Sequence, residues 1–128
     1  MGSYSDEIKS HVGEAINHLQ AAKNLLENGQ LDAAAARASE CAFHMGSALL
    51  LDEEIETNRH GDVITLLQEM FVNGRLLTKD QGGDLSWIFA MRNAEDRAAS
   101  IRVTPEEAHR AVEIAESFFE AAKVILEG

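Results

Sequence analysis

Two arginines, an asparagine and an aspartate lie close together in the last third of the chain. They are Arg92, Asn93, Asp96 and Arg97. The planar guanidinium group of an arginine donates paired hydrogen bonds to a phosphate or a carboxylate, and this binding is stronger where water is partly excluded. The residue types and their spacing therefore predict a binding site for a phosphate group.

The same residues also have a simpler interpretation. Arg92 and Asp96 are four positions apart, so on a regular α-helix they face the same side and can form an ion pair. Such a pair contributes only about 0.3–0.5 kcal/mol on a solvated surface. In this alternative, the arginines pair with Asp96 and Glu95 and bind no ligand.

The histidines do not follow the spacing of a metal-binding motif. Four of them are spread along the helical segments, at His11, His18, His44 and His109. No pair of histidines or cysteines has the spacing expected of two ligands on one helix face, and the single Cys41 cannot build a zinc site alone. We therefore expect no metal and no cofactor.

The net charge of the chain restricts its partners. At -11, the surface is acidic overall, whereas phosphate backbones bind to clusters of lysine and arginine. We therefore expect no general DNA binding. A nucleotide or RNA ligand would have to bind to a few arginines in a local cleft.

The sequence has the features of a cytoplasmic protein. No apolar run of about 18 residues is present, so we expect no membrane span. The polar, acidic N-terminal residues predict no secretory signal. Cys41 has no cysteine to pair with, which suits the reducing cytoplasm.

Hydrophobic residues recur with helical periodicity along most of the 128 residues. The pattern predicts a first helix that ends at Asn28-Gly29. Further helices are predicted over residues 31–55, 63–72 and 85–100, with a flexible segment at 80–84. A final helix begins at Thr104, where Thr104, Pro105 and Glu107 form a capping box with proline at the first position. We therefore predict a single all-α domain over residues 1–128, an up-and-down four-helix bundle with one additional short helix.

The helix predicted over residues 85–100 is apolar on two sides. Trp87, Met91 and Ala94 share the side assigned to the bundle core. Leu85 and Phe89 lie on nearly the opposite side, in line with Arg92. A helix that is apolar on two sides has two surfaces to bury. The second surface predicts a homodimer, with Arg92 at the edge of the interface.

Two segments resemble a prokaryotic branch of the HEPN domain family. In the first, residues 59–79, a His60-Gly61 connector opens a helix that ends in Phe71-Val72 before a glycine. In the second, Arg92 is followed four positions later by an acidic residue, then by a helix that begins Val-Thr-Pro-Glu-Glu-Ala and ends rich in phenylalanine. The order of these features is similar over about residues 5–126.

The resemblance implies a function as well as a fold. HEPN domains are helical bundles that form symmetric dimers with a cleft between the protomers. Many are metal-independent ribonucleases, in which four to six residues separate the arginine from a histidine. Others act beside a minimal nucleotidyltransferase in toxin–antitoxin pairs, where a tyrosine just beyond the motif is modified with AMP.

The chain matches only the first half of that motif. Arg92 and Asn93 agree with it, whereas Arg97 and the two residues after it stand where the histidine would fall. The only tyrosine is Tyr4, far from the motif. Without the histidine, an acid–base group worth about 10²–10⁴-fold in rate is missing. His60 is the best remaining imidazole, because the resemblance places it in a recurring connector.

These observations lead to three hypotheses. In the leading one, the chain is a dimeric HEPN protein without the usual catalysis, which binds nucleotide or RNA phosphate at Arg92, Asn93 and Arg97 and acts with a minimal nucleotidyltransferase partner in a toxin–antitoxin-type system. In the second, it is an active metal-independent ribonuclease toxin in which Arg97 or His60 replaces the missing histidine. In the third, it is a structural dimer without a ligand.

Overall fold

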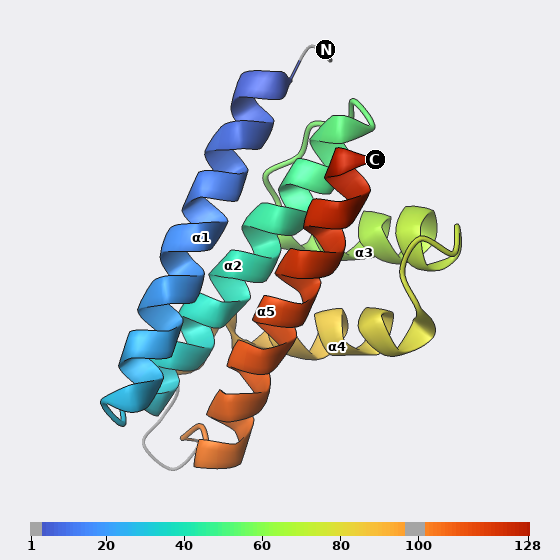
Figure 1. Ribbon diagram of the computed structural model, residues 1–128. Coiled ribbons are helices and arrows are strands. Elements are labelled where there is room, and N and C mark those ends of the chain that lie inside the picture. The colour runs from blue at the N-terminus through green and yellow to red at the C-terminus, as the bar shows by residue number, and fades with distance from the viewer. Residues whose placement is uncertain (1–3, 97–101) are drawn as a thin grey trace.

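The computed structural model describes residues 4–96 and 102–128, and the regular elements within them are helices. Three long helices lie side by side: α1 (Ser5–Glu27), α2 (Leu31–Asp52) and α5 (Pro105–Glu127). Two shorter helices, α3 (His60–Leu67) and α4 (Lys79–Phe89), run across them (Figure 1). The prediction of an all-α helical bundle is confirmed.

The two crossing helices continue as irregular turns. A π-helix, η1 (Gln68–Val72), follows α3, and a 3-10 helix, η2 (Ala90–Asp96), follows α4. The fourth helix therefore begins earlier than predicted and changes its winding before Arg92. The end predicted for it, residues 97–100, lies outside the described residues.

The segment predicted to be flexible forms the first turns of α4. The Thr78 side chain accepts a hydrogen bond from the backbone N–H of Gln81 at 3.0 Å, and the Gln81 side chain accepts one from the N–H of Thr78 at 2.8 Å. This reciprocal cap satisfies two backbone donors that a helix start leaves free. The cap offsets the unfavourable effect of Gly82 and Gly83, which led us to predict a loop.

Helix α2 is the centre of the molecule and, among the described residues, contacts α1, α3, α4, α5 and η2. Its buried surface is built largely of alanine, together with Gly46. A Cβ atom added to Gly46 would lie 2.8 Å from Cδ1 of Leu67 and 3.1 Å from Cγ1 of Val63, closer than side chains normally approach. Gly46 therefore lets α3 lie directly against α2.

A half-buried glutamine joins η1 to α4. The Nε2 group of Gln68 donates to the carbonyl oxygen of Gly82 at 2.7 Å and to Oγ of Ser86 at 3.1 Å. A Cβ atom at Gly82 would lie 2.7 Å from Oε1 of Gln68, so glycine is needed for this approach. These contacts fix α4 relative to α3.

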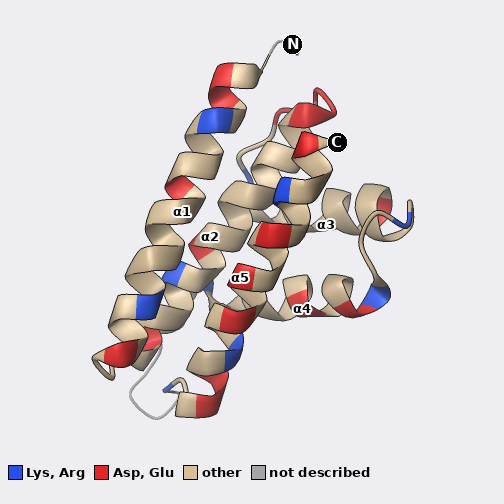
Figure 2. Cartoon of the chain, in the orientation of Figure 1, with Lys and Arg blue, Asp and Glu red and all other residues tan. Residues whose placement is uncertain are grey.

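Asp and Glu residues lie on each of the five α-helices (Figure 2). Among the described residues, none of the helices has the length and apolar character that a membrane crossing requires.

Candidate functional site

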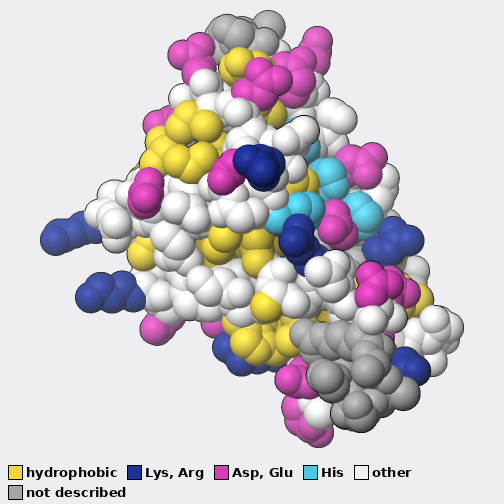
Figure 3. All heavy atoms as spheres, turned by 180° about the vertical axis from the view of Figure 1, so that it is seen from behind, with side chains coloured by type: hydrophobic (Ala, Val, Ile, Leu, Met, Phe, Trp, Pro, Cys, Tyr) yellow, Lys and Arg dark blue, Asp and Glu magenta, His cyan; other side chains and the backbone are white. Residues whose placement is uncertain are grey.

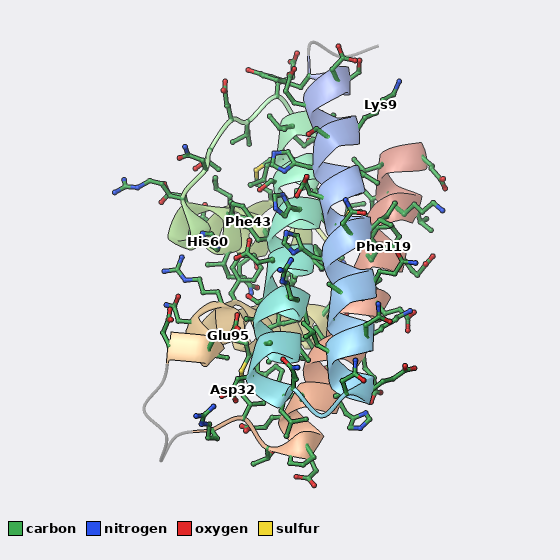
Figure 4. All side chains as sticks on the ribbon, turned by 90° about the vertical axis from the view of Figure 1, so that its left-hand side faces the viewer. Lys9, Asp32, Phe43, His60, Glu95 and Phe119 are labelled. Atoms are coloured by element: carbon green, nitrogen blue, oxygen red, sulfur yellow. The ribbon has the colours of Figure 1, made fainter. Side chains whose placement is uncertain are left out.

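The His60 ring is held between α2 and α4. It stacks on the ring of Phe43 from α2, with ring centres 3.9 Å apart and planes 13° from parallel. Phe89, the last residue of α4, approaches at 6.4 Å with its ring turned by 68°. Figure 4 shows Phe43 and His60 side by side, where α3 begins against α2. The orientation of the imidazole is therefore set by two aromatic neighbours.

One carboxylate faces this imidazole. The Nε2 atom of His60 lies 3.6 Å from Oε1 of Glu40, an ion-pair distance that is too long for a hydrogen bond. Nε2 is buried and has no hydrogen-bond partner among the described residues. An unpaired buried nitrogen is costly unless a ligand or water satisfies it. Nε2 of His60 therefore faces Glu40 within the fold, without a hydrogen bond to a described residue.

The surroundings of His60 favour its neutral form. Burial lowers the pKa of His60 below its ordinary value, and the positive charge of Arg92 lowers it further, while Glu40 acts in the opposite direction. A neutral imidazole can accept a proton, as a general base must.

Arg92 lies in η2, and its side chain is exposed. No ion pair joins it to any other described residue. The predicted pairing with Asp96 is therefore absent, for a reason visible in the backbone. A 3-10 helix has three residues per turn, so residues four apart no longer align. In addition, Asn93 departs from helical geometry, with φ -105° and ψ 22°.

The prediction that the fourth helix has a second apolar surface for another copy of the chain is wrong. Leu85 is 1% exposed and Phe89 is 7% exposed, and both belong to the core of this chain. Helix α4 crosses the bundle and packs against α2, α3 and α5, so its opposite sides are covered by the same chain. Trp87, which we assigned to the core, is half-buried, and the guanidinium of Arg110 lies over its ring at 4.2 Å.

The structure therefore brings together some of the predicted site residues. His60 and Arg92 are close enough to interact, and Asn93 and Asp96 are exposed on the same short helix as Arg92. Arg97 lies outside the described residues. We call Glu40, Phe43, His60, Phe89 and Arg92 the Arg92–His60 site.

Sequence reasoning missed two members of this site. Glu40 and Phe43 both lie in α2, which we interpreted only as a small-residue packing helix. Glu40 interrupts a stretch dominated by alanine and other small residues. A carboxylate within such a buried helix is unusual enough to have marked the site.

A second group of polar residues is also brought together, on α1 and α2. It comprises His11, Glu14, His18 and His44, which we call the histidine cluster. Nδ1 of His11 lies 2.9 Å from Nδ1 of His44, and the rings of His18 and His44 stack with centres 5.3 Å apart. Figure 3 shows histidine side chains gathered on the face opposite to that seen in Figure 1. The expectation that these histidines are spread apart is therefore wrong.

A pocket lies elsewhere, between the α1–α2 turn and the segment that leads into α5. Its lining includes Asp32, Glu95 and Arg102. Arg102 already binds Asp32, with Nη1 2.8 Å from Oδ2. The pocket therefore has little positive charge left for a phosphate, and Arg92 is not part of its lining.

Helices α3 and α4 cross a long hairpin formed by α1 and α2, and Arg92 is exposed on the turn that follows α4. The chain is therefore a small helical-bundle protein with a polar site on its surface. The HEPN domain family matches this chain over residues 8–125. The chain belongs to the HEPN family.

Three relatives with names in curated collections share the similarity over most of their length. The chain is 31% identical over 121 residues to "Putative toxin MJ0605" of Methanocaldococcus jannaschii, which covers 94% of this chain and 90% of that protein. It is 27% identical over 105 residues to "Putative toxin MJ0142" of the same organism, covering 82% and 71%. It is also 28% identical over 109 residues to a "UPF0332 protein" of Thermotoga maritima, covering 85% and 83%.

Proposed function

We propose that this chain is a toxin–antitoxin-type HEPN protein that binds the phosphate of a nucleotide or of RNA at Arg92, Asn93 and His60. The names of two similar proteins, each printed as "Putative toxin", support the toxin–antitoxin setting. One observation supports the site above all others: Arg92 is exposed, makes no ion pair with another described residue, and its charge acts on His60.

The chemistry of the site fits a phosphate better than a neutral ligand. An arginine that is not used within the chain can direct its paired donors outward. Asn93 adds an exposed amide, and Asp96 and Glu40 set a limit on how much negative charge the site accepts. A single phosphodiester or monophosphate carries about one or two negative charges, which these few donors can match.

The proposal includes a second copy of the chain and a partner. The HEPN fold implies a dimer with a cleft between protomers, and the exposed η2 segment is the surface we assign to that cleft. Leu85 and Phe89 take no part, because they are buried within one chain. A minimal nucleotidyltransferase is the proposed partner. It would not modify a tyrosine here, since Tyr4 lies at the start of α1, with its hydroxyl 3.3 Å from Glu56.

Binding of a short single-stranded RNA to the Arg92→Ala variant tests the proposal. Loss of one charge-assisted contact is expected to weaken binding about 10–100-fold. The dependence of log K on log salt should also become shallower by about 0.7, the value of one phosphate contact. Arg75→Ala is the matched control, because Arg75 is exposed on the turn before α4 and its φ of 66° strains alanine no more than arginine.

Equal losses for both variants would mean that binding depends only on total charge, and the proposed site would be wrong. Sedimentation of the same variants separates binding from assembly. If Arg92→Ala dissociates a dimer while RNA affinity per chain is unchanged, Arg92 is structural. AMP or ATP in place of RNA distinguishes a nucleotide ligand from a polymer.

The position of His60 favours a second candidate function, the cleavage of RNA without metal. Neutral His60 would take the proton of a ribose 2′-OH, whose oxygen then attacks the adjacent phosphorus. The bond to the 5′ oxygen breaks, and that oxygen gains a proton from water. Arg92 would stabilise the charge that develops on the phosphate oxygens. The products are a 2′,3′-cyclic phosphate and a 5′-hydroxyl.

Incubation of the chain with RNA in excess chelator tests this second function. If His60 is the base, His60→Ala should lower the cleavage rate by about 10²–10⁴-fold. His109→Ala, which removes an exposed imidazole from α5, should leave the rate unchanged. Absence of cleavage by the unaltered chain would remove this function and leave the binding proposal standing.

A further inference from the structure

We propose that Glu14 and His18 of α1, together with His44 of α2, form a binding site for a divalent transition-metal ion of the Zn²⁺ type. This site is separate from the Arg92–His60 site and does not depend on the proposed function. The proposal starts from geometry. One ligand atom from each of the three side chains lies within 4.8 Å of the other two.

The side chains need only a small adjustment to reach metal-binding distances. Nε2 of His18 is 3.9 Å from Oε2 of Glu14. Ligand atoms that bind one Zn²⁺ ion at about 2.0–2.1 Å in a tetrahedron are roughly 3.4 Å apart. Closing the site therefore requires movements of about 1 Å. Glu14 is exposed and can turn without disturbing the core.

The helix hairpin holds the ligands in position. Glu14 and His18 are four residues apart in α1 and so project from the same face. The ring of His44 comes from the facing helix and stacks on that of His18, with planes 10° apart, so one ring must turn for both to direct a nitrogen at the same ion. An ion bound here would join α1 to α2. Metal sites in helical bundles are built in the same way, from inward-facing side chains of neighbouring helices.

His11 supplies the outer support for the site. Its Nδ1 atom is 2.9 Å from Nδ1 of His44, so a hydrogen bond fixes the orientation of the His44 ring. A hydrogen-bond partner behind a metal-binding histidine is common, and here an imidazole takes the place of the usual carboxylate, carbonyl or water. Phe43 restrains the same ring from another side, edge-on at 5.4 Å.

The donor set selects the class of metal. Two imidazoles and one carboxylate are the ligands of many three-residue zinc sites, which leave a fourth position for water. Mg²⁺ and Ca²⁺ prefer sets built of oxygen atoms. Zn²⁺ and the neighbouring ions Co²⁺, Ni²⁺ and Cu²⁺ therefore fit best.

Arg37 acts against metal binding. Its Nη1 atom lies 3.2 Å from Nδ1 of His18, and because arginine can only donate, Nδ1 is the acceptor. The proton of the neutral His18 ring is then on Nε2, the atom that faces Glu14. A metal at Nε2 moves that proton to Nδ1, where it meets the Arg37 donor. Arg37 is exposed and can swing away, at a cost in affinity.

Titration of the metal-free chain with Zn²⁺ by calorimetry tests the site. We expect one ion per chain and a rise in melting temperature. His18→Ala and His44→Ala should each weaken binding by about 100-fold or more, since even supporting residues of metal sites are worth about 10–100-fold. Arg37→Ala should bind Zn²⁺ more tightly than the unaltered chain. His109→Ala removes a histidine outside the cluster and should bind normally.

Glu14→Gln tests whether a loss of Zn²⁺ affinity could be caused by misfolding. Glu14 is exposed, so this variant should melt as the unaltered chain does when metal is absent, yet bind Zn²⁺ more weakly. With Co²⁺, the visible absorption of a tetrahedral site should appear in the unaltered chain and weaken in Glu14→Gln. If Glu14→Gln binds as tightly as the unaltered chain, or if His109→Ala loses as much affinity as His44→Ala, the proposed site does not exist.

Discussion

The three long helices and the crossing segment are held together in different ways. In α1, α2 and α5, helical winding continues without interruption over 22 or 23 residues. The crossing segment, residues 60–96, changes from α to π winding after Leu67 and from α to 3-10 winding after Phe89. We call it the arm.

The difference shows where this fold carries its candidate chemistry. A long amphipathic helix is stabilised by many similar contacts, each contributing little. The arm also buries apolar side chains such as Leu85, but its position depends in addition on close individual contacts, such as Gly46 beneath α3 and Gln68 against Gly82. The Arg92–His60 site lies where the arm meets α2. Its geometry therefore depends both on the core beneath the arm and on those close contacts.

The largest expected effect comes from truncating a buried side chain in the core beneath the arm. Leu85→Ala removes a side chain that is 1% exposed and should lower the free energy of unfolding by about 2–5 kcal/mol. Leu76→Ala makes the same chemical change at a side chain that is 60% exposed, and should cost less than about 0.5 kcal/mol. Urea denaturation of both variants measures the difference.

This pair also tests the position of α4. If Leu85 lay on a surface between two copies, as its spacing predicted, Leu85→Ala would weaken self-association, and stability would depend on concentration. A concentration-independent loss supports a role within one chain.

A smaller effect is expected where the arm contacts α2. Gly46→Val places new atoms where even a Cβ lies 2.8 Å from Leu67, and overpacking of this kind costs about 1–3 kcal/mol. Gly13→Ala in α1 is the contrasting change, because nothing lies within 4 Å of the new Cβ. Alanine is the better helix former, so Gly13→Ala should stabilise the chain by about 0.5–1 kcal/mol.

The Gly46 variant should also disturb the site that the arm carries. Because Val63 and Leu67 follow His60 in α3, displacement of that helix moves the imidazole off Phe43. The chemical shifts of the His60 ring, measured by NMR, should change in Gly46→Val and remain as they are in Gly13→Ala. Unchanged shifts in both would show that α3 does not rest on Gly46.

The sequence predicted the long helices well and the arm less well, for a physical reason. Periodicity reports which face of a helix is buried, and α1 and α5 each have one dominant buried face. Helix α2 is buried on nearly every side, and its long, uninterrupted run of helix-forming residues was enough to predict it. Helix α4 is enclosed by three helices, so burial on both sides resembled a second binding surface. The capping box at Thr78 was overlooked because the glycines after it favour a loop.

Only part of the candidate site could be predicted, because the rest depends on how helices pack against one another. Arg92 and His60 could be selected from residue type and family resemblance, but their proximity depends on how the arm folds back onto α2. Glu40 and the histidine cluster depend on which faces of α1 and α2 meet. Side-chain groups that approach across two helices leave no fixed spacing in the sequence.

The smallest expected effect is electrostatic, and it tests whether the arm and α2 share one site. His60 has a pKa below the ordinary 6.5, chiefly through burial and further through Arg92, while Glu40 raises it. Removing the positive charge in Arg92→Gln should therefore raise the pKa of His60. Removing the negative charge in Glu40→Gln should lower it. NMR titration of the His60 ring measures both shifts directly.

The lowered pKa of His60 also makes the folded chain less stable at low pH. The unfolded chain binds a proton at His60 near pH 6.5, whereas the folded chain binds it only at lower pH. Between those values the unfolded chain holds more protons, so stability is unaffected well above pH 6.5 and falls as the pH drops through this window. His11 and His44 also have lowered pKa values and act in the same direction, so the contribution of His60 is the part lost in His60→Gln. If the His60 pKa is the same in Arg92→Gln and in the unaltered chain, the charge of Arg92 does not act on His60. The two residues would then not form one site.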